Sequence, residues 1–232
     1  MDHFPPHYFF DLSSYQHAAL FEKCIHVWDS LKNIENYLSA LSLGSIAVDI
    51  PQGAFLVNPH LITISKGTVV EPGAYIKGPC YIGENCTIRH GAYIRGNFIA
   101  GKDCVIGHDT EIKQAIFLDG AQAPHFAYVG DSILGNRVNL GAGTKCANLK
   151  LDHRPITVEA ETHRIDTHLR KFGAIFGDET QIGCNVVTHP GTLFGKQVFC
   201  YPCLSVGGFI PSQSIVKNEQ HLVIKPRAKF ER

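Results

Sequence analysis

The sequence has no excess of charge of either sign and no long hydrophobic run. Its 21 Lys and Arg residues balance 21 Asp and Glu residues, so the formal net charge at pH 7 is zero. That balance does not favour a nucleic acid or a membrane surface as a partner. No apolar stretch reaches the roughly 18 residues that a membrane-spanning helix needs. The opening MDHFPPHYFF lacks the charged-then-apolar order of a signal peptide, so a cytoplasmic protein is expected.

Paired cysteine motifs are also scarce. The eight cysteines are scattered and include a single Cys-x-x-Cys pair, Cys200 and Cys203. A structural zinc site of the ribbon or finger type needs two such pairs, so no metal site of that kind is predicted. Disulfides are not expected in the reducing environment of the cytoplasm.

Residues 1–44 differ in pattern from the rest of the chain. Ser13 and Ser14 are plausible N-caps, and Gly44 is a plausible stop. Between them, apolar residues recur in steps of three and four, at Leu20, Cys24, Trp28, Leu31, Ile34, Leu38 and Leu41. The spacing predicts an amphipathic helix or helix pair. We interpret this N-terminal helical segment as a packing or capping element, with a docking surface for a partner as the alternative.

From residue 45 onward the sequence carries a six-residue repeat. Ten consecutive positions are aliphatic: Ile64, Val70, Ile76, Ile82, Ile88, Ile94, Ala100, Ile106, Ile112 and Leu118. Two places earlier the residues are mostly small, and Cys80, Cys86 and Cys104 are among them. A period of six is typical of a parallel β-helix, in which each hexapeptide supplies a short strand and a corner. Residues 45–232 are therefore predicted to form an all-β domain, with Cys146 and Cys200 also in its core.

The repeat is interrupted twice. The first interruption is FLDGAQAPHFAYVGDSILG (residues 117–135), after which the six-residue repeat of aliphatic positions continues, shifted by one residue. Over residues 149–172 it stops, and the polar stretch LKLDHRPITVEAETHRIDTHLRK predicts an inserted loop or hairpin. Such segments often carry function. The end of the chain is basic, with Lys225, Arg227, Lys229 and Arg232, and is interpreted as a solvated tail or an anchor for a phosphorylated ligand.

One column of the predicted solenoid is cationic. Three hexapeptides form one coil, so residues about 18 apart should stack on one face. Lys77, Arg95 and Lys113 share this spacing. Stacked like charges repel, and a bound phosphate would relieve the repulsion. The alternative is that these flexible side chains spread into water.

His125 is the candidate general base. It lies inside the first interruption, where the segment 120–128 reads as out of phase. A regular scaffold usually departs from its own rule where function requires it. Imidazole suits the removal of a proton from an attacking amine. The glycines of NLGAGT (residues 139–144) would let backbone N–H groups approach a ligand closely.

These motifs resemble a known family. Residues 60–210, and above all Glu111–Asn148, are similar to the hexapeptide-repeat acyltransferases, in particular the acetyltransferase half of the bifunctional glucosamine-1-phosphate N-acetyltransferase and uridylyltransferase. The matching positions are Glu111, Lys113, His125, Tyr128, Gly130, Asp131, Asn139, Gly141, Ala142, Gly143, Thr144, Cys146 and Asn148. The resemblance implies a left-handed parallel β-helix, a homotrimer and an acyl-CoA cleft between subunits.

The resemblance also implies roles for single residues. His125 would be the general base, and Arg95, Lys113 and Tyr128 would hold the sugar phosphate. Asn139 would contact the sugar, Ala142 would line the acetyl-CoA pocket, and Asn148 would position the acetyl group. The family has a further lysine in the loop after Asn148, for which Arg154 is the candidate here. Cys184 stands where the family has a serine in the CoA region.

The expected function is therefore acetyl transfer from acetyl-CoA to the amine of an amino-sugar 1-phosphate. The family's nucleotidyltransferase domain is absent from this sequence, so a separate nucleotidyltransferase is a candidate partner. Four alternatives stay open: acylation of a nucleotide-linked amino sugar, O-acylation, a non-catalytic trimeric scaffold, and a γ-type carbonic anhydrase. The last would use histidines such as His90 and His108, which are one coil apart.

Overall fold

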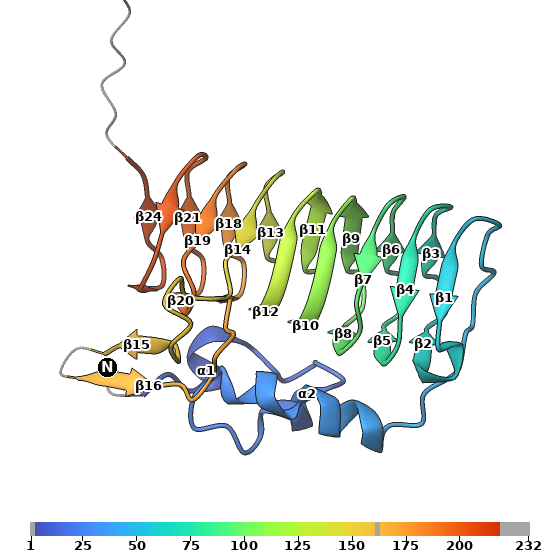
Figure 1. Cartoon of the computed structure of the whole chain (residues 1–232), viewed down its shortest axis with the longest axis horizontal. Coiled ribbons are helices and arrows are strands. Elements are labelled where there is room, and N and C mark those ends of the chain that lie inside the picture. Colours follow the sequence, from blue (N-terminus) through green and yellow to red (C-terminus); the bar gives the residue numbers. More distant parts are fainter. Residues whose placement is uncertain (1–2, 161–162, 219–232) are drawn as a thin grey trace, which may run out of the picture.

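The structure is a computed structural model that describes residues 3–160 and 163–218. The basic residues Lys225, Arg227, Lys229 and Arg232 lie outside the described residues. The described chain forms the predicted left-handed parallel β-helix, with a few short helices packed along one side (Figure 1). Among the described residues no helix is long and apolar enough to cross a bilayer.

Three faces of stacked parallel strands build the solenoid. The first face contains β1 (Phe55–Val57), β4 (Tyr75–Lys77), β7 (Tyr93–Ile94), β10 (Glu111–Phe117), β12 (Tyr128–Leu134), β14 (Lys145–Cys146), β19 (Val187–Thr188) and β22 (Ser205–Val206). The second face contains β2 (Ile62–Ile64), β5 (Cys80–Ile82), β8 (Phe98–Ala100), the later halves of β10 and β12, β17 (Ala174–Phe176), β20 (Thr192–Phe194) and β23 (Phe209–Ile210). The third face contains β3 (Val69–Val70), β6 (Thr87–Ile88), β9 (Val105–His108), β11 (Gln122–His125), β13 (Asn139–Leu140), β18 (Gln181–Ile182), β21 (Phe199–Cys200) and β24 (Ile215–Val216). A short 3-10 helix, η2 (Pro59–Leu61), joins β1 to β2.

The hexapeptide residues fill the interior as predicted. Nine of the ten aliphatic positions, from Ile64 to Ile112, belong to one buried core that also holds Cys80, Cys86, Cys104, Cys146 and Cys200. The tenth, Leu118, is an exception. It is buried on the outside of the second face, and its neighbour Phe117 takes the inward place. The six-residue repeat is therefore already shifted by one residue before residue 117.

The slip occurs at a corner between the first and second faces. Cys80 pairs with Phe98, 18 residues on, whereas Phe98 pairs with Ala115, 17 residues on. A single residue, Gln114, turns this corner, and Asp131 alone turns it in the next coil. Both adopt left-handed backbone angles, with φ of 49° and 51°. Side chains on either side of these two corners are thus drawn together.

The N-terminal segment is less helical than its pattern predicts. It contains α1 (Pro6–Phe9), the 3-10 helix η1 (Ala18–Phe21) and α2 (Asp29–Ala40). Ser13 and Ser14 do not cap a helix, and α2 begins after Trp28. The apolar residues of this segment, including Leu31, Ile34 and Leu38, form a second core against the outside of the second face. Tertiary packing of large aromatic rings, rather than helix propensity, decides these short elements.

Residues 149–172 contain a β-hairpin. β15 (Thr157–Glu159) pairs antiparallel with β16 (Arg164–Asp166). Ile156 and Val158 are buried in the same second core as the N-terminal segment. The hairpin and the N-terminal segment therefore share one side of the solenoid (Figure 1).

His17 makes this second core sensitive to acid. Its ring is 2% exposed, its Nδ1 lies 3.0 Å from the Tyr37 hydroxyl, and its Nε2 has no hydrogen-bond partner. Burial lowers the pKa of His17 from 6.5 to about 4. The unfolded chain then binds a proton at a higher pH than the folded chain, so stability falls as pH drops from about 6.5 towards 4.

We predict that the free energy of unfolding, measured in urea, falls by about 2 kcal/mol from this group between pH 7 and pH 5. His17→Gln cannot take up the proton, so this variant loses less stability over the same interval. An equal loss in both proteins would contradict the prediction.

Candidate functional site

The predicted site residues fall into two sets on different parts of the solenoid. Arg95, Lys113 and Tyr128 point out from the first face, and Asn148 follows β14 at the end of that face. His125, Ala142 and Cys184 stack at the corner between the third and first faces, and Asn139 lies on the third face itself. We call His125, Ala142 and Cys184 the His125 edge.

A hydrogen-bonded cluster surrounds Lys113. Its Nζ donates to both carboxylate oxygens of Asp131, at 3.1 and 3.0 Å. Asn148 Nδ2 donates to Asp131 Oδ2 at 2.5 Å and to the Tyr128 hydroxyl at 3.1 Å. We call Lys113, Tyr128, Asp131 and Asn148 the Lys113 cluster. It combines a cation, a phenol and an amide, which are groups that bind phosphate and sugar hydroxyls.

Burial shapes this cluster. The side chains of Lys113 and Asp131 are 23% and 8% exposed, so their ion pair is largely shielded from water. Partial burial raises the pKa of Tyr128, and its hydroxyl stays protonated as a donor. Asp131 is the single residue that turns its corner, and from there its carboxylate reaches Lys113 of β10.

The cationic column is compensated within the chain. Arg95 Nη1 donates to Glu111 Oε1 at 2.8 Å, and this bond raises the pKa of Arg95. Together with Lys113 and Asp131, this pair relieves the like-charge repulsion that the sequence suggested a ligand would relieve. Lys77 is exposed and forms no ion pair with a described residue. A bound phosphate would therefore add to these pairs or displace their carboxylates.

His125 occupies a regular position, contrary to the sequence interpretation. It pairs with His108, and Gln122 and Ala123 pair with Val105 and Ile106, so the segment 120–128 is in phase with the coil before it. The apparent break reflects the deletion at Gln114 further upstream. His125 is exposed at its corner.

The backbone near His125 is nevertheless unusual. A Cβ atom at Gly107 would lie 1.8 Å from the carbonyl oxygen of Pro124, so only glycine lets β11 approach β9 this closely. Phe126 has φ of 32° and a ring that is 52% exposed. A bulky residue with positive φ is strained, and such strain gathers at functional sites.

Among the described residues, no hydrogen bond or ion pair joins the His125 side chain to the Lys113 cluster. His108, the strand partner of His125, precedes Lys113 by five residues, across the corner between the third and first faces. Asn139 points out from the third face, away from Tyr128 on the first. The two sets therefore line different sides of one corner.

The hairpin contributes a cation that sequence reasoning missed. The N–H of Phe172 donates to the Asn148 carbonyl at 2.9 Å, and the N–H of Gly173 donates to the Asp131 carbonyl at 2.8 Å. The backbone of Lys171 therefore runs next to the Lys113 cluster, and its exposed side chain forms no ion pair with a described residue. Its position at the end of the insertion, where the chain re-enters the coil, was the available signal.

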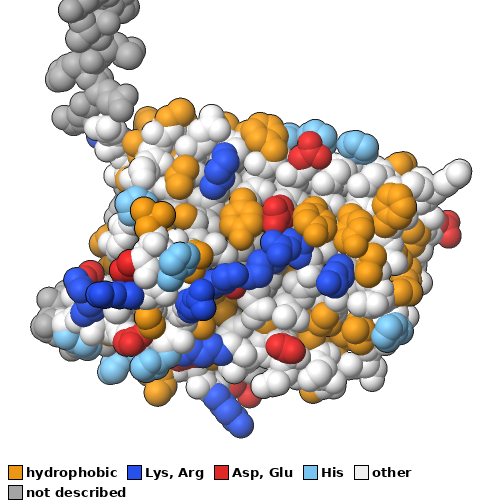
Figure 2. All heavy atoms as spheres, viewed as in Figure 1, with side chains coloured by type: hydrophobic (Ala, Val, Ile, Leu, Met, Phe, Trp, Pro, Cys, Tyr) orange, Lys and Arg blue, Asp and Glu red, His pale blue; other side chains and the backbone are white. Residues whose placement is uncertain are grey.

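Arg154 lies at the start of the insertion, next to an acidic turn. Its backbone N–H donates to Asp152 Oδ1 at 3.1 Å, and its side chain is exposed. Among the described residues, no hydrogen bond or ion pair joins its side chain to the Lys113 cluster. Figure 2 shows Lys and Arg side chains in a band that runs over the first face towards β15 and β16.

The histidine column offers no complete metal site in one chain. The rings of His90 and His108 stack with centroids 5.7 Å apart, and their Nδ1 atoms lie 2.7 and 3.1 Å from backbone carbonyl oxygens. Among residues 3–160 and 163–218 no group of three or more His, Cys, Asp or Glu side chains could hold a metal ion.

Comparison with known proteins identifies the fold family. A family model described as the GMPPB C-terminal domain matches residues 76–223, which is more than half of the chain. The matched region contains every predicted site residue and leaves out the N-terminal segment.

Curated relatives include bifunctional enzymes. A bifunctional sugar-1-phosphate nucleotidylyltransferase/acetyltransferase from Sulfurisphaera tokodaii is 39% identical over 92 residues, which cover 40% of this chain and 23% of the relative. A protein named bifunctional protein GlmU from Methanococcus maripaludis is 30% identical over 199 residues, covering 86% of this chain and 47% of the relative. These names confirm the resemblance seen in the sequence. The chain spans less than half of the length of these relatives.

A solved structure, that of the polysialic acid O-acetyltransferase OatWY, covers 72% of this chain at 15% identity with a TM-score of 0.28. A superposition at this level carries no information about function.

Lys171, rather than Arg154, is expected to strengthen anion binding at the Lys113 cluster. We predict that Lys171→Ala weakens the binding of a hexose 1-phosphate about 5- to 10-fold in calorimetric titration at low salt, since it removes one charge-assisted contact. Arg154→Ala is the matched control and should change the affinity less than 2-fold. A larger effect from Arg154→Ala would contradict this assignment.

Proposed function

The chain belongs to the family described as the GMPPB C-terminal domain, and from this premise we propose that it is an N-acetyltransferase that transfers the acetyl group of acetyl-CoA to the amine of an amino-sugar 1-phosphate. The observation that carries the proposal is the Lys113 cluster, a shielded group of cation, phenol and amide beside a cationic column. The acetyltransferase named among the bifunctional relatives supports the reaction class.

The acceptor phosphate would be bound on the first face. Arg95 and Lys113 supply charge, and Tyr128 supplies a protonated hydroxyl. Lys171 adds an ammonium that forms no ion pair with a described residue, and Arg154 remains a further candidate from the same insertion. Asn139 would bind a sugar hydroxyl from the third face.

The chemistry would take place at the His125 edge. A neutral imidazole at His125 accepts the proton that the acceptor amine loses as its nitrogen forms a bond to the thioester carbonyl carbon. The carbon–sulfur bond then breaks, and the CoA thiolate leaves and takes up a proton. Ala142 and Cys184, which stack above His125, would line the path of the CoA arm, and Asn148 would orient the acetyl group.

The site would be completed between two copies of the chain. The acceptor amine and phosphate are neighbours in the substrate, whereas His125 and Lys113 of one chain lie on different sides of a corner. In a homotrimer, the His125 edge of one copy can face the Lys113 cluster of its neighbour. This arrangement unites the two sets without any change in the fold.

A second candidate is a non-catalytic scaffold that binds a separate nucleotidyltransferase. One observation favours it: Arg95 and Lys113 are already paired with carboxylates. A thiol-release assay with acetyl-CoA and a panel of amino-sugar phosphates and nucleotide-linked amino sugars separates the two. If none of the acceptors in the panel causes release of the CoA thiol, the scaffold is favoured.

His125→Ala is predicted to lower turnover at least about 100-fold, because general-base catalysis typically contributes this much. Acceptor binding should be retained, as measured by calorimetry. Unchanged turnover would remove His125 from the mechanism.

Neutralising the phosphate site should affect one substrate only. Arg95→Gln or Lys113→Gln is predicted to raise the KM for the amino-sugar phosphate about 10-fold or more, since each removes a charge-assisted hydrogen bond. The KM for acetyl-CoA should change less than 2-fold. Equal effects on both constants in steady-state assays would argue against a phosphate role.

A further inference from the structure

We infer that the N-terminal segment, residues 3–43, positions the acceptor site from the outside of the second face, through Trp28 and Leu31. This inference rests on the proposed function for its kinetic consequences, but its structural part stands on contacts alone. The segment lies outside the region matched by the family model. The contacts that it makes are therefore additions to the solenoid that the family model describes.

The first contact reaches the corner next to Lys113. Gln114 Nε2 donates to the backbone carbonyl of Leu31 in α2 at 2.8 Å. Gln114 is the single residue that turns the shortened corner, and its Oε1 also accepts a hydrogen bond from Asn97 at 3.0 Å. The direction in which Lys113 leaves the first face therefore depends on a bond to the N-terminal segment.

The second contact reaches the return strand of the insertion. The ring of Trp28 packs on the ring of Phe172 with centroids 5.9 Å apart, and the two side chains are 1% and 0% exposed. The N–H of Phe172 donates to the backbone carbonyl of Asn148, and the N–H of the next residue, Gly173, donates to the backbone carbonyl of Asp131. Trp28 thus supports the residues that fix the Lys113 cluster and Lys171.

Trp28 itself is held from several sides. His26 stacks on it with centroids 4.5 Å apart and planes within 9°, and Phe4 packs on it at 5.8 Å. The N–H of Val27 donates to the Phe4 carbonyl at 2.7 Å. The indole therefore has little freedom to move without moving Phe172.

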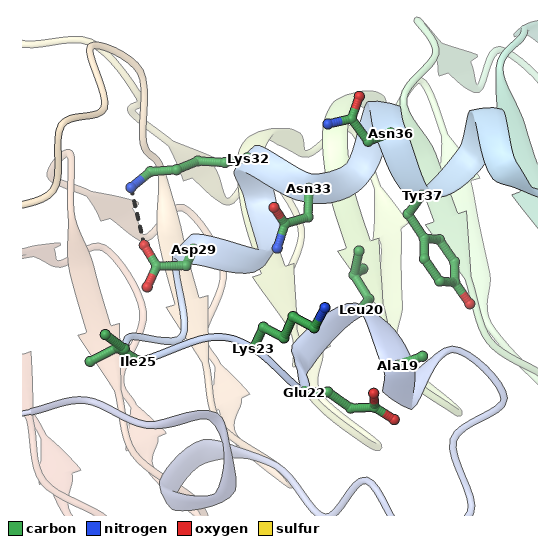
Figure 3. Close-up of a pocket in the computed structure, with 10 residues that line it drawn as sticks. All are labelled: Ala19, Leu20, Glu22, Lys23, Ile25, Asp29, Lys32, Asn33, Asn36 and Tyr37. Carbon is green, nitrogen blue, oxygen red and sulfur yellow. Dashed lines mark hydrogen bonds and ion pairs between the residues drawn. The ribbon is translucent and has the colours of Figure 1, made fainter.

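The other side of α2 takes no part in these contacts. Figure 3 shows Lys32, Asn33 and Asn36 on the side of α2 that lines a cavity of about 590 Å³ with η1. The buried side of the helix, with Leu31, Ile34 and Leu38, packs in the second core. Leu38, which is also fully buried but lies near the other end of α2, ten residues after Trp28, provides the control.

The test compares Trp28→Ala and Gln114→Ala with the control Leu38→Ala in the full chain. Amide hydrogen exchange of Phe172 and Gly173 is followed by NMR or mass spectrometry. We expect exchange at these two amides to be about 10-fold faster in Trp28→Ala than in Leu38→Ala. Relative to the wild-type chain, Trp28→Ala and Gln114→Ala should raise the KM for glucosamine 1-phosphate about 10-fold. The KM for acetyl-CoA should change less than 2-fold. Trp28→Phe should restore most of both values.

Each outcome decides the inference. Exchange at Phe172 and Gly173 that is no faster in Trp28→Ala than in Leu38→Ala, or acceptor and acetyl-CoA constants that shift together, would overturn it. If the wild-type chain acetylates no acceptor, the proposed function fails, and the exchange result alone decides whether the segment positions the cluster. If Trp28→Ala does not fold, Gln114→Ala decides the inference through the same split in KM, with the value for glucosamine 1-phosphate raised about 10-fold and that for acetyl-CoA changed less than 2-fold.

Discussion

The hydrogen-bonded stacking of one coil on the next is the constraint on which the rest of the structure depends. Each coil fixes the height and direction of every side chain in the following coil, because parallel strands must keep their register. One residue less at a corner cannot be absorbed locally, and it shifts every later residue. The corners at Gln114 and Asp131 are such places, and the Lys113 cluster forms around the second of them.

Much of the fold was readable from the sequence, because a solenoid converts a fixed chain interval into a fixed spatial relation. The aliphatic hexads predicted the interior up to Ile112, and the column of Arg95 and Lys113 stacked as expected. The location of the slip was misread, because a shortened corner shows in the aliphatic repeat only at its next position, and here Phe117 fills that position in place of Leu118. The short N-terminal elements could not be predicted, since aromatic packing on the second face decides them.

The sequence singled out the residues of the Lys113 cluster but did not reveal how they are arranged relative to His125. Lys113, Tyr128 and Asn148 come together as a cluster, whereas His125 and Asn139 lie across a corner from it. Sequence spacing cannot reveal this division, because it does not say which neighbours meet in an assembly. Lys171 escaped notice for a related reason: the hairpin returns to Asn148 through a hydrogen bond between residues 24 positions apart.

The account therefore depends on two copies of the chain sharing one site, and a subunit-mixing experiment tests this most directly. His125→Ala and Lys113→Gln are mixed in equal amounts, unfolded and refolded together, and assayed for acetyl transfer at an acceptor concentration well below the wild-type KM, where each variant alone should be strongly impaired. In random trimers about a quarter of the sites would pair an intact His125 with an intact Lys113 from the neighbouring copy. Recovery of about a quarter of the wild-type rate is predicted. No recovery, from mixed assemblies shown to have formed, would contradict the shared site.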